Sequence, residues 1–212
     1  MLPIEEKRKQ FAALVAEAAA CRRCPAMCGR TAVMSERNGD VSARVMFVGE
    51  APGRQGGDRT RVPFSGDQSG RNFQRYIDSI NLPRSDLFIM NAVLCNPRKS
   101  SGANRRPTGA EIANCSEYLR RLVELIDPAV VVTLGRVALE AVGRVAPHGL
   151  SLRESAGRVE GWGGRLLVPL YHPSPQVLAS HRREAEQLAD YRAVALAVES
   201  ATAAQTPRRK GT

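Results

Sequence analysis

Long apolar runs, targeting signals and aromatic residues are scarce or missing in this sequence. Its 212 residues contain no stretch of 18 consecutive apolar residues, so we expect no segment that spans a membrane. The first residues, Met1 to Lys7, lack the basic flank, apolar stretch and cleavage site of a secretory signal, which favours a cytosolic protein. Aromatic residues make up only 5%, but hydrophobic residues reach 43% and charged residues 25%, values typical of a globular chain. The length favours one compact domain.

Acidic residues and lysine are also in short supply. The sequence has 31 Lys and Arg against 21 Asp and Glu, a formal net charge of +10, and 27 of the 31 cations are Arg. The planar guanidinium fork matches phosphate groups and base edges, so nucleic acid is a natural partner for such a chain. A GC-rich genome produces the same bias, and composition alone leaves both explanations open.

Cysteine occurs only five times, and a cytosolic compartment would keep these thiols reduced rather than paired in disulfides. Cys21 and Cys24 form a C-x2-C pair, Cys28 follows four residues later, and Cys95 and Cys115 lie far downstream. One local pair and two distant thiols give four possible metal ligands and one spare cysteine.

Apolar periodicity predicts helices that alternate with short buried strands. The predicted helices cover residues 4–20, 71–80, 108–126, 137–142 and 184–200, and the predicted strands cover residues 45–48, 87–90, 129–134 and 165–170. Thr108 with Glu111 three residues later is the pattern of a helix-initiating capping box. We therefore expect an α/β fold, a three-layer α/β/α structure with a central, mostly parallel four-stranded sheet. Residues 1–200 would form the single domain, and residues 201–212 a disordered basic tail.

Polar segments follow three of the predicted strands, at residues 49–70, 91–107 and 172–176. Ligands of parallel sheets bind beyond the carboxyl ends of the strands, so these segments should line one cleft. No G-x-G-x-x-G motif and no P-loop is present, which argues against a dinucleotide or nucleoside triphosphate as the ligand.

The side chains in these segments suit work on a nucleobase. Glu50 and Asp67 are carboxylates, Phe64 offers a ring for stacking, Asn91 offers a bidentate amide, and His172 offers an imidazole. Taken singly, a Phe is usually a core residue and a His usually a hydrogen-bonded structural one. Together they are what recognising and cleaving off a base would require.

At these residues the sequence resembles the iron-sulfur uracil-DNA glycosylases of family 4, with features of the related family 5. The motifs follow the family order over residues 20–180. They are Cys21-x2-Cys24-Pro25, Gly29-Arg30-Thr31, Met46 to Gly53 (MFVGEAPG), Pro63-Phe64-x-Gly66, Asn91-Ala92-Val93-x-Cys95, Asn104-Arg105-x-Pro107, Glu111 with Cys115, Leu134-Gly135 and His172-Pro173-Ser174. Two further segments look like family 5, namely Gly56 to Thr60 (GGDRT) and Gly66-Asp67-x-Ser69-Gly70.

The resemblance implies a metal centre with a structural role. Cys21, Cys24, Cys95 and Cys115 would hold a [4Fe-4S] cluster, and Cys28 would be the spare thiol. Zinc held by four cysteines is the competing interpretation, because spacing alone does not separate the two metals.

The same resemblance assigns the pocket. Phe64 would stack on a flipped-out uracil, Asn91 would bind its pairing edge, and His172 would stabilise the departing uracil anion. Gly49 and Ala51 would complete the substrate-binding wall. Glu50 matches the family 4 carboxylate and Asp67 a family 5 carboxylate, and which of them orients the attacking water stays open, as does activity on other deaminated bases.

The remaining expectations concern DNA. Predicted DNA contacts are Arg59, Arg105, Ser174, Leu178 and Arg182, within a phosphate-binding rim that also includes Arg61, Arg98 and Arg183. Leu178 would be an apolar wedge in the minor groove, or else an ordinary helix-packing residue.

The sequence thus predicts a monomeric, monofunctional uracil-DNA glycosylase of base excision repair, in the cytosol of a bacterium or archaeon and associated with its nucleoid. The alternatives are a non-catalytic protein that binds damaged DNA with the same pocket, and an iron-sulfur electron carrier.

Overall fold

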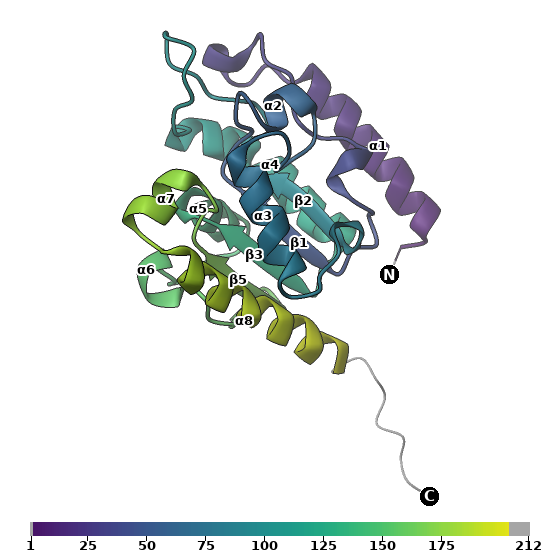
Figure 1. The fold of residues 1–212 in the computed structure, drawn as a ribbon. Coiled ribbons are helices and arrows are strands. Elements are labelled where there is room, and N and C mark those ends of the chain that lie inside the picture. The colour runs from purple at the N-terminus through teal and green to yellow at the C-terminus, as the bar shows by residue number, and fades with distance from the viewer. Residues whose placement is uncertain (1, 204–212) are drawn as a thin grey trace, which may run out of the picture.

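The computed structural model describes residues 2–203, and its centre is a five-stranded sheet (Figure 1). The strands are β1 (Val45–Gly49), β2 (Leu87–Asn91), β3 (Val130–Leu134), β4 (Glu160–Trp162) and β5 (Arg165–Leu170). Their order across the sheet is β2-β1-β3-β5-β4. The first four strands in this order run parallel to one another, and β4 pairs with β5 antiparallel.

The four predicted strands are confirmed, and the sheet has one strand more than predicted. The additional strand, β4, is only three residues long and joins β5 through Gly163 and Gly164, which have φ angles of +53° and +77°. A Gly-Gly pair at positive φ is a hairpin signal. Because only Trp162 of β4 is buried, the strand lacks the apolar run that marked the other four.

Helices cover both faces of the sheet, so the predicted three-layer α/β/α architecture is confirmed. On one face, α1 (Ile4–Ala20), α4 (Gly109–Ile126) and α5 (Arg136–Val145) pack with inward residues of β1, β2 and β3. On the other, α3 (Gln68–Asp78) and α8 (Glu184–Ala203) pack against the alternate residues of the same strands. In the view of Figure 1, α3 and α8 lie in front of the sheet.

Short helical segments connect these elements. They are α2 (Gly57–Thr60), α6 (Leu152–Ser155) and α7 (Pro175–Ser180), together with 3-10 turns at Pro25–Met27, Glu36–Asn38 and Arg84–Asp86. In the described part of the chain no helix is long and apolar enough to cross a membrane.

A local sequence signal sets the start of α4. The predicted capping box is present at α4, where the Thr108 hydroxyl accepts from the Glu111 amide and the Glu111 carboxylate accepts from the Thr108 amide.

At the C-terminus the predicted disordered tail was wrong for three residues, because α8 continues through residues 201–203. Alanine favours helix, and Arg44 donates to the carbonyl of Ala201. The rest of the predicted tail, residues 204–212, lies outside the described residues.

The parallel register brings the ends of β1 and β2 together. Gly49 pairs with Asn91, and the Ala92 amide donates to the Gly49 carbonyl at 2.8 Å. On the far side of β1, the Gly135 amide after β3 donates to Leu170 at the end of β5. The polar segments that follow these strands therefore start from one edge of the sheet, as predicted.

Candidate active site and cysteine cluster

A pocket of about 360 Å³ lies at the carboxyl edge of the sheet. The segments after β1, β2 and β5 all contribute to it, together with the start of α3. Its lining residues are Glu50, Ala51, Pro52, Gly53, Phe64, Asp67, Ser69, Asn96, Pro97, Asn104, Arg105, His172, Ser174, Gln176 and Val177. The three predicted segments thus line one cleft, and both predicted carboxylates, the aromatic ring and the imidazole face it.

The backbone of Phe64 is held in a conformation that non-glycine residues rarely adopt, with φ at +48°. Arg84 donates to the carbonyls of Pro63 and Phe64, and no acidic side chain in the described residues forms a salt bridge with it. On the other side of the loop, a Cβ at Gly70 would come within 2.7 Å of the Phe64 carbonyl. These contacts fix the ring at the pocket, where its centroid lies 4.9 Å from that of Phe73 and 5.6 Å from that of His172.

Asn91, at the end of β2, is not among the residues that line the pocket, and only 3% of it is exposed. A Cβ at Gly49 would lie 2.5 Å from the Asn91 Oδ1 and 2.7 Å from the Phe64 ring. Glycine is therefore required at position 49 for the amide and the ring to come so close. The resulting pair, a ring face beside a buried amide, is suited to stack a planar base and bind its edge.

The two carboxylates differ in their surroundings. Burial raises the pKa of the Glu50 carboxyl above its usual range, and the Arg106 and Arg136 guanidinium groups act in the opposite direction. Asp67 also caps α3, since its Oδ1 accepts from the Gly70 amide at 2.9 Å. Its other oxygen, Oδ2, faces the turn after β1, 3.1 Å from the position of a Cβ at Gly53. Both acids are half-buried, but Glu50 is the one whose pKa is raised by desolvation, and Asp67 is a helix cap that also lines the pocket.

His172 follows β5 and turns its ring toward Phe64. Burial lowers the pKa of the His172 imidazole to about 4, although the Asp67 carboxylate raises it. The ring is therefore neutral near pH 7. A neutral imidazole still donates one N–H hydrogen bond, so it can stabilise negative charge without bringing a positive charge into the pocket.

The four predicted ligand cysteines are brought together from distant parts of the chain. Burial, and then the neighbouring Cys115, Cys21 and Cys24 thiols, raise the pKa of Cys95 to about 12. Cys115 itself lies on α4 and is 7% exposed. Within the described residues, no three His, Cys, Asp or Glu side chains are placed to hold a single metal ion. Cys28 is exposed and its thiol donates to the carbonyls of Arg22 and Cys24.

Comparison with known proteins gives the family. The family model of the uracil DNA glycosylase superfamily matches residues 36–195, which include the whole sheet and every pocket-lining residue. The chain belongs to this superfamily.

Individual relatives carry two different type names. The type-4 uracil-DNA glycosylase of Thermotoga maritima is 35% identical over 155 residues, 73% of this chain and 76% of that protein. The type-5 uracil-DNA glycosylase of Pyrobaculum aerophilum is 35% identical over 165 residues, 72% of this chain and 70% of that protein. The type-4 enzyme of Archaeoglobus fulgidus is 32% identical over 176 residues, covering 81% and 85%. The mixture of family 4 and family 5 motifs in the sequence matches this dual similarity.

In this superfamily member, the arginines predicted to contact DNA also bind other parts of the chain. Arg105 lines the pocket but forms a two-pronged ion pair with Glu111 on α4. Arg182 lies outside the pocket and forms a similar pair with Asp190 on α8. Arg59 is exposed and donates to two backbone carbonyls of its own loop. Their contact with DNA stays a prediction, and the ion pairs give the first two a further role in fixing loops.

Ser174 and Leu178 lie on the segment after β5. Ser174 lines the pocket, and the preceding Pro173 carbonyl accepts from the buried Asn72 amide at 2.9 Å, which anchors this segment to α3. Leu178 lies on α7 and is half-buried. Its role as a wedge stays a prediction.

Sequence reasoning did not assign several pocket residues. These are Pro52, Gly53, Ser69, Asn96, Pro97, Asn104, Gln176 and Val177. Asn104 belonged to a recognised motif, but nothing in the sequence indicated the direction of its amide. Asn96 directly follows the predicted ligand Cys95, and this position could have indicated that the pocket and the cysteine cluster lie next to each other.

The depressed pKa of His172 predicts a pH dependence of stability. Above about pH 6.5 the ring is neutral in both the folded and the unfolded chain. Between that pH and about 4, only the unfolded chain takes up the proton, so the free energy of unfolding falls as the pH falls. In His172→Gln this contribution is absent. We expect its melting temperature to fall less than that of the wild type between about pH 7.5 and about pH 5. Equal falls would contradict the neutral, buried imidazole.

Proposed function

We propose that this chain is a DNA glycosylase that hydrolyses the N-glycosidic bond of uracil in DNA, as the names of its relatives indicate. The observation that carries the proposal is the arrangement around Gly49. The Phe64 ring and the Asn91 amide approach each other over this glycine, and Glu50, Asp67 and His172 face the adjoining pocket. A base inside a duplex cannot reach such a site, so the uracil must be flipped out of the stack.

The chemistry follows from these side chains. Phe64 stacks on the uracil face, and Asn91 pairs with its edge through one donor and one acceptor. As the N-glycosidic bond breaks, negative charge develops on the uracil, and the neutral His172 donates an N–H to it. Positive charge develops on the sugar, where a carboxylate stabilises it and orients the water that adds to C1′.

Glu50 is the carboxylate that we assign to the sugar and the water. Desolvation raises the pKa of its carboxyl, whereas one oxygen of Asp67 is already engaged as the acceptor that caps α3. We expect Glu50→Gln to slow excision about a hundredfold, the usual contribution of a positioned acid or base. Asp67→Asn keeps the cap acceptor and should cost less. A larger loss in Asp67→Asn would assign the water to Asp67.

The direct test is excision from a uracil-containing oligonucleotide followed by alkali. Wild-type protein should give strand scission at the uracil, and Glu50→Gln, purified in the same way, should give much less in the same time. No scission in single-stranded DNA or in any duplex context would overturn the proposal. Tight binding of uracil-DNA without release of the base would point instead to a non-catalytic binding protein.

The cysteines fit a [4Fe-4S] cluster held by Cys21, Cys24, Cys95 and Cys115. In a four-cysteine zinc site the sulfurs lie about 3.8 Å apart, because each Zn–S bond is about 2.3 Å. Here the Cys95 thiol lies near the other three thiols, as either centre would require, and the similarity to type-4 relatives supports the cluster. When bound, the cluster would supply a cross-link rather than redox chemistry. It would join the segment after α1 and the segment after β2 to α4.

The remaining parts of the proposal concern the range of action. The family 5-like motifs of the sequence, at residues 56–60 and 66–70, support activity on other deaminated bases besides uracil. The net charge of +10 supports binding to DNA phosphates in the nucleoid, in the cytosol of a bacterium or archaeon. We infer that the protein acts as a monomer of a single domain, which extends to the end of α8 at Ala203.

A further inference from the structure

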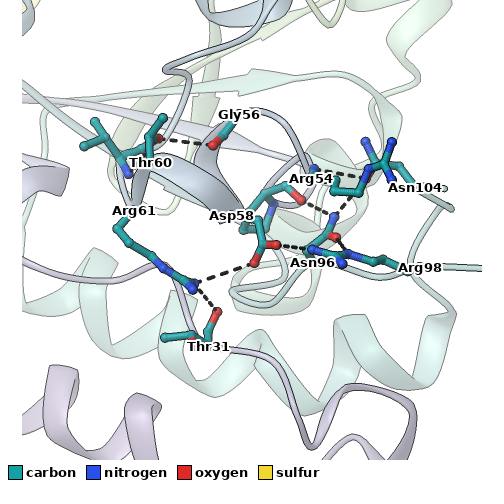
Figure 2. A network of polar contacts seen from close by, with 11 residues as sticks. Thr31, Arg54, Gly56, Asp58, Thr60, Arg61, Asn96, Arg98 and Asn104 are labelled. Carbon is teal, nitrogen blue, oxygen red and sulfur yellow. Dashed lines mark hydrogen bonds and ion pairs between the residues drawn. The ribbon is translucent and has the colours of Figure 1, made fainter. Parts of the chain in front are cut away.

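Asp58 is a buried acid at the centre of a polar network beside the pocket (Figure 2). It lies on α2 and is 8% exposed. Its carboxylate forms an ion pair with Arg98 from the segment after β2, and the Arg61 guanidinium lies 3.6 Å away. Arg61 also reaches the carbonyl of Thr31, near the cysteine pair. The network therefore joins three segments that are far apart in the sequence.

The network determines which way two amide side chains point. Arg98 has only donors, so the amide of Asn96 must turn its oxygen toward the Arg98 Nε. The Asn96 NH2 then faces the other way and donates to the Pro52 carbonyl at 2.5 Å and to the Asn104 oxygen at 3.1 Å. Each amide is thus oriented by the group before it, starting from the charge of Asp58.

Asn104 is the last member of this series. Its oxygen accepts from Asn96 and also from the backbone amide of Arg54 at 3.0 Å. Since the oxygen is fixed by two donors, the NH2 group must point elsewhere, and it lies 3.7 Å from the position of a Cβ at Gly53. The Asp67 Oδ2 lies 3.1 Å from that same position. Asn104 is exposed and lines the pocket, and its NH2 lies on the side of Gly53, another pocket-lining residue.

We propose that Asp58 is a positioning residue that, through Arg98 and Asn96, fixes the Asn104 amide so that its NH2 donates to an oxygen of the nucleotide bound in the pocket. The inference rests on the proposed function and adds one binding residue, Asn104, and one residue that acts only through others, Asp58. Without the relay, the Asn104 oxygen keeps only the Arg54 backbone amide as a donor. The amide is then held less firmly and rotates more readily to present its oxygen, which would repel the oxygens of a nucleotide.

The same geometry changes the expectation for Arg98. A guanidinium in a phosphate-binding rim would be exposed and free, but the Arg98 side chain is only 22% exposed and is paired with Asp58. Its donors are directed to Asp58 and Asn96, within the protein. We therefore assign Arg98 to the relay rather than to the DNA backbone.

Asp58→Asn tests the relay because it keeps the shape of the side chain and removes the charge. We expect single-turnover excision of uracil to slow about tenfold, the effect of losing one oriented hydrogen bond. Asn104→Ala removes the donor itself at an exposed position, where the fold should tolerate it, and should slow excision by the same factor. Because both changes break one relay, the double variant should be no slower than either single variant.

Asp127→Asn is the matched control. It makes the same chemical change in another ion pair, since Asp127 binds Arg165 at 2.6 Å at the opposite edge of the sheet. We expect its excision rate to equal that of the wild type. We would also measure DNA affinity by fluorescence anisotropy over a range of salt concentrations. Together with the melting temperature, it separates the relay from two simpler roles, a structural brace at Asp58 and a phosphate ligand at Arg98.

Three results would overturn the proposal. If Asp58→Asn lowers only the melting temperature and leaves the excision rate unchanged, Asp58 is a structural brace. If it tightens DNA binding and steepens the salt dependence, Arg98 is a phosphate ligand restrained by Asp58. If the effects of Asp58→Asn and Asn104→Ala multiply, no relay joins the two residues.

Failure of the relay and failure of the proposed function give different results. Active wild-type protein with unaffected variants removes the relay alone. If the wild type is inactive, the Asn104 side-chain amide signals in NMR spectra still test the relay. They should shift in Asp58→Asn and not in Asp127→Asn, and unchanged signals would contradict it.

Discussion

Asn91→Asp should slow uracil excision by roughly a thousandfold or more, because a site built around a hydrogen bond to its substrate strongly rejects a mismatch. The substitution replaces the NH2 donor by a second acceptor, which faces a uracil carbonyl oxygen. Asn91 is 3% exposed and its amide lies against Gly49 and Phe64, so water cannot readily fill the mismatch. Single-turnover excision from a uracil oligonucleotide measures the effect.

Asn81→Asp provides the control for Asn91→Asp. Asn81 is exposed, adopts φ +51°, which Asp tolerates as well, and lies at the end of the sheet away from the pocket, before β2. This variant should excise uracil like the wild type, although it carries the same added charge. Unchanged excision by Asn91→Asp would show that Asn91 does not bind the base edge.

If the proposed cluster ligands are right, Cys115→Ser should abolish iron binding and remove most of the protein's stability. Structural metal sites contribute on the order of 10 kcal/mol, which is comparable to the whole stability of a domain. Cys115 is 7% exposed and belongs to the core cluster around α4 and the sheet, so the substitution also buries a polar hydroxyl there. Iron content, absorption at about 400 nm and the melting temperature measure the effect.

Cys28→Ser is the corresponding control. Cys28 is exposed, and its thiol donates only to backbone carbonyls. We expect full iron content and an unchanged melting temperature. Normal iron content in Cys115→Ser would contradict the ligand assignment. One zinc per wild-type chain, without absorption near 400 nm, would replace the cluster by the four-cysteine zinc site.

The fold could be predicted from the sequence wherever burial imposed a simple pattern. The strands β1, β2, β3 and β5 are continuous apolar runs because both of their faces are covered by helices. The capping box of Thr108 and Glu111 predicted the start of α4. The short strand β4 was missed because its stability comes from pairing with β5 at the sheet edge, not from burial of its own residues.

The candidate site was predictable to a similar extent. Parallel strands end at one edge of a sheet, so the order of strands and polar segments already placed Glu50, Phe64, Asp67 and His172 around one cleft. The cysteine spacing, together with the family resemblance, singled out the four thiols that lie together. These conclusions depended on residue type and topology, which the sequence contains.

Only the tertiary structure decided the ion pairs of the arginines, the protonation state of His172 and the direction of the Asn104 amide. Arg98, Arg105 and Arg182 look alike in the sequence, but buried carboxylates on α2, α4 and α8 hold them within the protein. The neutral state of His172 depends on the burial of its ring. The orientation of the Asn104 amide depends on two donors, the backbone amide of Arg54 and the side chain of Asn96. The sequence by itself determined which chemical groups reach the pocket, and only long-range contacts determined which way those groups face and which of them are charged.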